Sequence, residues 1–227
     1  MELYDVMRTT FAARDYTGEE VPDQILYEVL ENARFAPSGG NRQGGHVVIV
    51  RDPATKDALA RLTEPAAKRY RAQIEAGESP WNAVVPTTVS EETIAATRAP
   101  SMLTEPLRKA SAVLIVLVDL RAVASMDQNL DRIGIISGAS VYPMVWNILL
   151  GLRQAGYGGT ITTLAVASEP EVKALLGVPG HFAVCACIPI GKPVKQLTRL
   201  KRRPVEDFVT RERFDGPALE APGKAGA

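Results

Sequence analysis

The stretch APSGGNRQ, residues 36–43, decides how the rest of the chain is interpreted, because it ends a helical pattern with a flexible polar loop. The preceding run, residues 22–34, predicts a helix, since a proline stands near its start and apolar residues recur at three- and four-residue spacings. Glycines in the loop allow backbone to approach a ligand closely, and Ser38, Asn41 and Gln43 carry both donors and acceptors. The loop suits a planar heterocycle or a phosphate, although the same residues are also ordinary in a polar turn.

Two basic segments far apart in the chain add to this pattern. The run RTTFAARDY, residues 8–16, places two arginines on either side of two threonine hydroxyls, and RLKRRP occupies residues 199–204. Arginine offers a rigid fork of donors that matches phosphate. Each segment alone is most often explained as a solvated surface. If the two segments and the loop meet in space, they form an anion site beside a site for an aromatic ring.

The order and spacing of these segments resemble those of the FMN-dependent nitroreductase family. The resemblance runs from about residue 1 to residue 214 and also includes LLGVP at 175–179 and the apolar run 182–190 before GKP. It implies one FMN-binding domain with an α+β fold, in which a mixed β-sheet is surrounded by helices. It also implies a homodimer, with a long central helix at the interface and FMN bound between the subunits.

The resemblance assigns roles to polar residues from four segments. Arg8 and Arg202 would hold the phosphate, and Arg14 would reach the pyrimidine side of the flavin. The loop 37–39 would cover the flavin from the partner subunit, and one of the threonines 162–163 would donate to the reactive flavin nitrogen. The implied cofactor contacts are Arg8, Thr9, Thr10, Arg14, Pro37, Ser38, Gly39, Asn41, Gln43, Thr162, Thr163 and Arg202.

The function implied by the resemblance is transfer of reducing equivalents from NADH or NADPH to a small organic acceptor, such as a nitroaromatic or a quinone. No side chain is needed as a general acid, because solvent can supply protons. Two alternatives stay open, namely other flavin chemistry (reductive dehalogenation or enone reduction) and non-enzymatic flavin binding or storage. The irregular span 64–107, with Tyr70 and Trp81, is interpreted as a lid-like insertion or as a variable surface excursion.

Composition agrees with a globular enzyme. The chain has 227 residues, which fits one domain with a full core. Hydrophobic residues make up 46% and charged residues 23%, as is typical of globular domains. Lys and Arg total 26, as do Asp and Glu, so the formal net charge of zero argues against nucleic acid or an anionic membrane as the main partner. No G-x-G-x-x-G follows a predicted strand, so a Rossmann site is not indicated.

The cysteines and histidines predict neither a disulfide nor a metal site. Cys185 and Cys187 are two apart in an apolar run, where a strand would point both side chains the same way. Such a pair is poorly placed for a disulfide, and two ligands do not make a zinc site. We therefore expect core thiols in a reducing compartment. His46 and His181 lack neighbouring ligands, and the first residues lack the apolar core of a signal peptide, so we expect a cytoplasmic protein without a metal.

Patterns along the chain predict the remaining elements. Strands are expected over 46–51, 112–118, 157–163 and 182–190, and helices over 54–62 and 169–176, the latter with Ser168 as N-cap and Gly177 as its stop. The uncharged run 133–152 has the length of a membrane span. Its glycines, serines and proline favour a buried helix instead, either at a dimer interface or within one subunit. The segment 215–227 is expected to be disordered.

Overall fold

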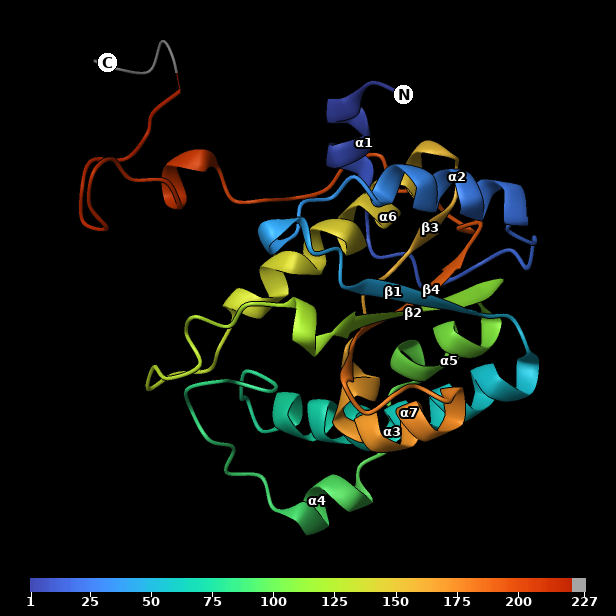
Figure 1. The fold of residues 1–227 in the computed structure, drawn as a ribbon. Coiled ribbons are helices and arrows are strands. Elements are labelled where there is room, and N and C mark those ends of the chain that lie inside the picture. Colours follow the sequence, from blue (N-terminus) through green and yellow to red (C-terminus); the bar gives the residue numbers. More distant parts are fainter. Residues whose placement is uncertain (222–227) are drawn as a thin grey trace.

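A computed structural model describes residues 1–221 and shows an α+β fold in which helices cover both faces of one sheet (Figure 1). The helices are α1 (Leu3–Thr9), α2 (Asp23–Ala33), α3 (Pro53–Glu75), α4 (Glu91–Ala96), α5 (Ser101–Lys109), α6 (Tyr142–Gln154) and α7 (Glu169–Leu176). The 3-10 helices are η1 (Gly39–Asn41), η2 (Leu120–Ala122), η3 (Ile136–Ser140), η4 (Leu164–Ser168) and η5 (Val205–Asp207). The strands are β1 (Gly45–Val50), β2 (Ala112–Asp119), β3 (Gly158–Gly159) and β4 (Phe182–Gly191).

The sheet has the strand order β1-β2-β4-β3, and each of these neighbouring pairs is antiparallel. A parallel contact joins the N-terminal segment to this sheet through the isolated bridge between Ala12 and Gly159. The predicted α+β class is confirmed, and so are the strands expected around 46–51, 112–118 and 182–190. The remaining expected strand, 157–163, is reduced to β3 and a single bridge between Thr162 and Cys187.

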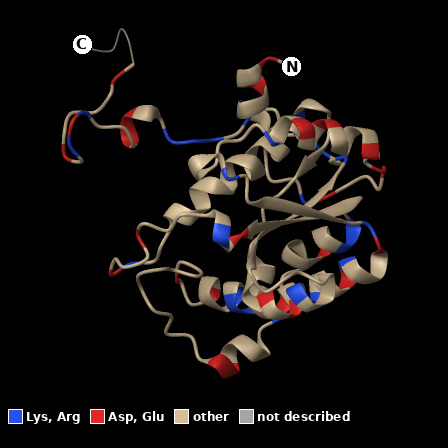
Figure 2. Ribbon diagram, viewed as in Figure 1, with Lys and Arg blue, Asp and Glu red and all other residues tan. Residues whose placement is uncertain are grey.

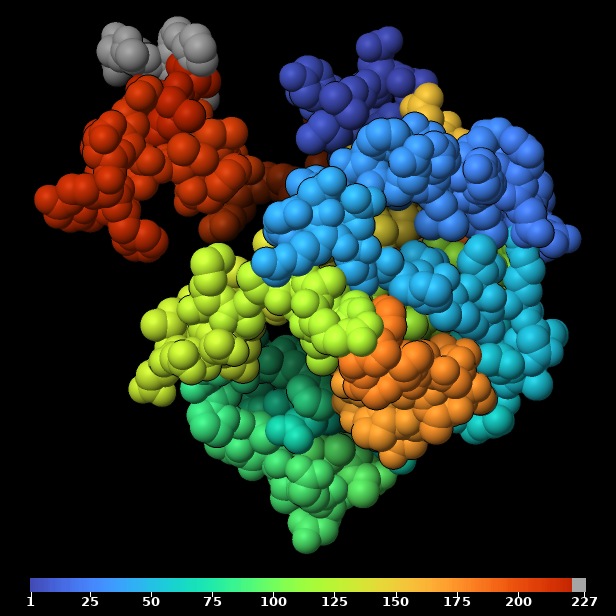
Figure 3. Space-filling model, viewed as in Figure 1, coloured from blue at the N-terminus to red at the C-terminus, as the bar shows by residue number. Residues whose placement is uncertain are grey.

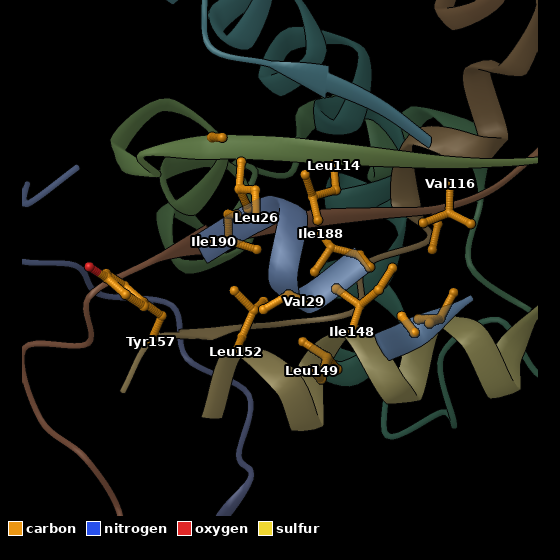
Figure 4. Close-up of a cluster of buried hydrophobic side chains, with 14 of the residues drawn as sticks. Leu26, Val29, Leu114, Val116, Ile148, Leu149, Leu152, Tyr157, Ile188 and Ile190 are labelled. Carbon is orange, nitrogen blue, oxygen red and sulfur yellow. The ribbon is translucent and has the colours of Figure 1, made fainter. Parts of the chain in front are cut away.

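Two layers of apolar side chains enclose the sheet. Leu114 and Val116 of β2 face α2 and α6, where Ile148 packs with them (Figure 4). Val113 and Ile115 face the opposite layer of α3, α5 and α7. Because β2 is buried on both faces, it reads as a continuous apolar run rather than an alternating one. Burial of one such side chain stabilises the fold by about 1.5–3 kcal/mol.

The prediction that the two cysteines point the same way is wrong. Val116 pairs with Ala186, but Leu117 pairs with Val184, so Cys185 is an extra residue in β4, a β-bulge. The bulge turns Cys185 toward the layer of α2 and α6, whereas Cys187 lies in the opposite layer. Both thiols are unpaired, as expected. Burial raises the pKa of Cys185 to about 11 and that of Cys187 to about 12.

The single helix expected over 133–152 is also wrong. The run divides into the 3-10 helix η3 and the helix α6, which starts at Tyr142 with Pro143 in its first turn, a favoured place for proline. Before η3 the chain folds around buried Asp127, whose carboxylate accepts N–H bonds from Ile135 at 2.7 Å and Ile136 at 3.3 Å. These bonds lower the pKa of Asp127. Within residues 1–221, no helix is long and apolar enough to cross a bilayer.

The span 64–107 is more regular than its sequence suggests. Helix α3 continues through Pro65 to Glu75, and α4 and α5 follow, so irregular backbone is confined to two loops, 76–90 and 97–100. A proline inside a helix removes one backbone bond. Buried α3 residues on both sides of Pro65, such as Leu59 and Ala67, offset this loss through packing. A lid role for the span stays a prediction.

At α7 the predicted stop is confirmed and the predicted capping contact is not. Gly177 adopts φ +64°, the left-handed conformation that ends a helix. Ser168 stands at the N-cap position, but its hydroxyl donates to Leu62 O at 3.0 Å and makes no cap bond. The serine therefore ties η4 to α3.

Residues 196–221 form a C-terminal arm that extends away from the rest of the molecule (Figure 3). At its root the Gln196 amide donates to Thr9 O at 3.1 Å. Farther along, a bridge between Thr210 and Ala218 closes a small hairpin. The disorder expected over 215–227 stays a prediction. Residues 222–227 lie outside the described part of the chain.

Candidate functional site

A small cleft lies where the N-terminal segment meets β3 and η4. Its volume is about 190 Å³. Arg14, the run 160–164, Tyr70 of α3 and Met102 of α5 are among its lining residues. Arg14, Thr162 and Thr163, which the family resemblance assigns to one site, are thus brought together by the fold. Sequence reasoning missed Thr160 and Met102.

Backbone pairing on both sides of Arg14 fixes its position. The Ala13 N–H donates to Gly159 O at 3.0 Å, and the Thr17 N–H donates to Lys192 O at 2.9 Å. Buried Tyr16 reinforces the seam, because its hydroxyl lies 2.8 Å from both Ala13 O and Pro189 O. Burial raises the pKa of Tyr16 well above its usual range.

The Arg14 guanidinium keeps most of its donors available. It is exposed, and within residues 1–221 its hydrogen bonding is limited to a long contact of 3.4 Å from Nη1 to Ala12 O. Within the described part of the chain, the residues that line the cleft include no Asp or Glu, so it contains no carboxylate. An unopposed guanidinium in such a cleft attracts an anion or the electron-rich edge of a heterocycle.

The two threonines offer different donors to the cleft. Both backbone groups of Thr162 are committed to Cys187, with the N–H donating at 2.9 Å and the carbonyl accepting at 2.8 Å. Thr162 therefore has only its hydroxyl to offer a ligand. The Thr163 carbonyl accepts from Val166 N at 3.0 Å, whereas the described residues provide no acceptor for its N–H or its hydroxyl. Thr163 can consequently donate through backbone and side chain alike.

The three residues before the cleft are engaged within and around α1. Arg8 is exposed and lies over the Tyr4 ring, 5.9 Å from its centroid. The Thr9 hydroxyl donates to Asp5 O at 2.6 Å and accepts from Arg153 Nε at 3.0 Å. Thr10 is buried, and its hydroxyl donates to Val6 O at 2.7 Å, so it presents no free donor. Arg153 was not predicted, because a lone arginine at the end of a helix carries no sequence signal.

The loop 37–43 lies against η3 instead of the cleft. The Gly39 N–H donates to Ser140 Oγ at 3.0 Å, and the Gln43 N–H donates to Ser38 Oγ at 3.0 Å. Gln43 and Asn41 both have positive φ, so the loop is tightly wound. Pro37, Gly39, Asn41 and Gln43 are exposed. In the described part of the chain, no hydrogen bond or ion pair joins this loop to Arg14, Thr162 or Thr163.

The last predicted residue, Arg202, lies on the arm. It is exposed, and its Nη1 donates to Lys201 O at 2.7 Å. Figure 2 shows the basic stretch 199–203 on the extended chain that leads away from the body. The fold of the chain therefore gathers Arg14 and the threonines at one cleft, whereas Arg8, the loop 37–43 and Arg202 are not part of its lining.

The cleft fits part of a flavin. Its volume of about 190 Å³ is below the ~300–1,000 Å³ that is usual for cofactor sites. Arg14 and the threonine donors match the polar edge of a fused heterocycle, but a phosphate has no arginine pair within this cleft. Among residues 1–221, no three His, Cys, Asp or Glu side chains gather as metal ligands would.

Comparison with known proteins gives a consistent result. A model described as the Nitroreductase family matches residues 7–192. A protein named NADH dehydrogenase from Thermus thermophilus is 32% identical over 205 residues, which cover 86% of this chain and 89% of that protein. Iodotyrosine deiodinase 1 of Homo sapiens is 23% identical over 219 residues, covering 92% of this chain and 68% of that protein. The crystal structure of oxidised iodotyrosine deiodinase bound to FMN and 3-iodo-L-tyrosine superposes with a TM-score of 0.67 at 22% identity, over 93% of this chain and 99% of that one.

Proposed function

From the premise that the chain belongs to the nitroreductase family, we propose that it is an FMN-dependent oxidoreductase that passes reducing equivalents from NADH or NADPH to a small organic acceptor. A nitroaromatic or a quinone is the acceptor class we favour. The observation that carries the proposal is the convergence of Arg14 with the donors of Thr162 and Thr163 on one cleft without a carboxylate. A relative named NADH dehydrogenase supports a nicotinamide donor.

In this proposal each cleft residue has a defined task. A bound flavin supplies the redox chemistry. Arg14 stabilises negative charge at the pyrimidine edge, since an unopposed guanidinium favours an anion. Thr163, or the hydroxyl of Thr162, donates a hydrogen bond to the reactive ring nitrogen. Protons come from solvent, because the cleft holds no carboxyl or imidazole group.

We propose that the complete site forms between two copies of the chain. One cleft of about 190 Å³ covers only part of a flavin. The loop 37–43 would cover the ring from the partner subunit, with Arg8 and Arg202 on the phosphate and Thr9 beside the ribityl chain. Exposed apolar side chains near α6, including Tyr142 and Trp146, support an interface there.

Reductive dehalogenation is the second candidate. Its support is the similarity over most of this chain to proteins named iodotyrosine deiodinase. The same cleft residues would serve that reaction, because it also begins with a reduced flavin.

We further propose a cytoplasmic location for the protein. Its two unpaired thiols, one of them fully buried, are compatible with a reducing compartment.

The test is reconstitution with FMN, followed by desalting and an absorption spectrum. Retention of about one flavin per subunit, anaerobic bleaching by NADH or NADPH, and reoxidation by an acceptor are expected. Comparison of a nitroaromatic, a quinone and an iodotyrosine as acceptors separates the two candidates. A protein that retains flavin but is not bleached would be a flavin-binding or storage protein, and a colourless protein would refute the redox proposal.

Matched arginine variants locate the flavin. Arg14→Ala should lower FMN retention at least tenfold. Arg71→Ala is the control, because Arg71 is an exposed residue of α3 whose ion pair is with Glu75 on the same helix. Equal retention by the two variants would contradict the placement of the flavin at Arg14.

A further inference from the structure

A second cleft lies on the outer side of η4, between α3 and α4. Its volume is about 490 Å³, and its lining includes Arg69, Trp81 and Ile94. It touches the end of η4 at Ser168, whereas the Arg14 cleft touches the start of η4. The two clefts have no lining residue in common. A ligand in the second cleft is therefore separate from the proposed flavin site.

Arg69 lies in this cleft with its positive charge only loosely paired. Its side chain is only 33% exposed, and the nearest carboxylate oxygen, from Glu91, is 3.7 Å from Nη1, which is too long for a hydrogen bond. Its Nε is buried and unpaired. Within residues 1–221, no acceptor forms a hydrogen bond with any N–H group of Arg69. A buried donor of this kind is satisfied by water or by a ligand that is not part of the chain.

Trp81 is held over this guanidinium by its backbone. The Arg69 guanidinium carbon lies 4.9 Å from the Trp81 ring centroid. Trp81 has φ +53°, a conformation that bulky residues rarely adopt. Its N–H donates to Oε1 of buried Gln73 at 3.1 Å. The strained backbone thus keeps an indole beside a cation that forms no hydrogen bond within residues 1–221 and has only a long ion pair with Glu91.

The loop around Trp81 is closed by a carboxylate. Glu78 accepts a hydrogen bond from Thr87 Oγ1 at 2.5 Å and one from the Thr88 N–H at 2.7 Å. The closure fixes both ends of the loop that carries the indole. In Figure 1 this loop runs from the end of α3 down to α4. The cleft is consequently a built feature of the fold.

We propose that this second cleft binds a planar aromatic anion, whose acidic group pairs with Arg69 and whose ring packs against Trp81. The guanidinium fork matches a carboxylate or phosphate with two parallel hydrogen bonds. An aromatic ring beside the indole gains offset or edge-on stacking. The volume of about 490 Å³ lies within the ~300–1,000 Å³ of small-molecule sites. Arg61 and Lys68 add positive charge to the lining, partly balanced by two glutamates.

Two kinds of ligand share this chemistry, namely an aromatic carboxylate and the adenosine monophosphate part of a nucleotide. Calorimetric titration of the full chain with benzoate, with AMP and with inorganic phosphate distinguishes them. Tighter binding of benzoate indicates the carboxylate source, and tighter binding of AMP indicates the nucleotide source. Phosphate alone should bind at least tenfold more weakly than the better of the two. Equal binding of phosphate would mean that the ring plays no part and would overturn the proposal.

Variants assign the binding to this cleft. Arg69→Gln should weaken binding at least tenfold, and Arg69→Lys should weaken it several-fold, because lysine keeps the charge without the fork. Arg71→Gln, on the same helix and exposed, should change it less than twofold. Circular dichroism melts establish that each variant is folded. Binding that survives Arg69→Gln but is lost in Arg14→Ala would place the ligand in the first cleft, and that result, or absence of binding by benzoate and AMP alike, refutes the proposal.

Discussion

Replacement of Tyr16 by phenylalanine removes the hydroxyl that ties the segment of Arg14 to β4. The ring itself keeps its place, because Gly191 leaves room for it: a Cβ at Gly191 would lie 2.8 Å from the Tyr16 ring. The hydroxyl is 2.8 Å from Ala13 O and from Pro189 O. Its single hydrogen is shared between two carbonyls, so the variant loses one buried hydrogen bond and leaves acceptors unpaired. We expect the free energy of unfolding to fall by about 1–3 kcal/mol.

The same variant should change the response of the protein to alkali. Burial raises the pKa of Tyr16 in the folded state, while the unfolded state releases the phenolic proton near pH 10. Above about pH 10 the folded state therefore binds more protons, and stability falls as pH rises, by up to ~1.4 kcal/mol per pH unit from this group. Tyr16→Phe lacks that contribution. The raised pKa values of Cys185 and Cys187 act in both proteins and cancel in the comparison.

Urea unfolding followed by circular dichroism at pH 7, 10 and 11 measures both effects. Tyr27→Phe is the matched control, because Tyr27 is exposed on α2 and its hydroxyl forms no hydrogen bond within the described residues. A loss below about 0.5 kcal/mol in Tyr16→Phe, less than a typical single hydrogen bond, would refute the role of the hydroxyl. An alkaline slope equal to that of the wild type would refute the linkage.

Three further predictions follow from local geometry. Gly159→Ala places a methyl group 2.9 Å from a backbone oxygen and should cost about 1–3 kcal/mol, whereas Gly180→Ala meets open space; chemical unfolding compares them, and equal stabilities would contradict the crowding. Hydrogen bonds lower the pKa of Glu78 from 4.5 to about 2, so the closure of the loop 76–90 should be fully stable above about pH 4.5 and weaken progressively as pH falls toward 2. Glu78→Gln should be cut faster by protease at pH 7; equal cleavage would count against the closure. Asp127→Asn should speed hydrogen exchange over 123–141, because it weakens the bonds that organise this loop, and unchanged exchange would assign that order to other contacts.

Buried apolar runs and helical spacing were the parts of the fold that sequence could predict. Strand β2 is recognisable because burial on both faces demands a continuous run of branched apolar residues. Helix α2 is recognisable because its buried Leu26, Val29 and Ala33 follow a helical spacing. In both elements one local pattern coincides with the tertiary environment, so local reasoning is sufficient.

Prediction failed where tertiary packing overrides a local signal. Pro65 indicates the end of a helix, yet α3 continues because Ala66 and Ala67 are buried beyond it. A helical spacing of small residues on both sides of Pro65 was the signal that could have revealed the continuation. This error affects the candidate site, because two residues that line the cleft, Tyr70 of α3 and Met102 of α5, lie in the span that was interpreted as irregular.

The candidate site was predictable as a set of residue types and not as an arrangement. Arg14, Thr162 and Thr163 meet in one cleft because β3 pairs with β4 and the N-terminal segment pairs with β3. Arg8 carries the same chemistry as Arg14 but belongs to α1, lies over the Tyr4 ring and does not line the cleft. Such long-range pairing has no local sequence pattern, so the two arginines are distinguished by the family resemblance and not by the residues around them.

The extra residue in β4 has a consequence for comparisons between distant relatives. Before Cys185, the even-numbered Phe182 and Val184 face the layer of α3 and α7, and after it the odd-numbered Cys187 faces the same layer. The bulge shifts by one residue the alternation of β4 side chains between the two layers, as one inserted base shifts a reading frame. A relative with a regular strand would carry its layer-specific residues one position out of step on one side of Cys185. A gapless alignment through β4 would then match residues from opposite faces of the sheet, and a one-residue gap at this point restores the correspondence.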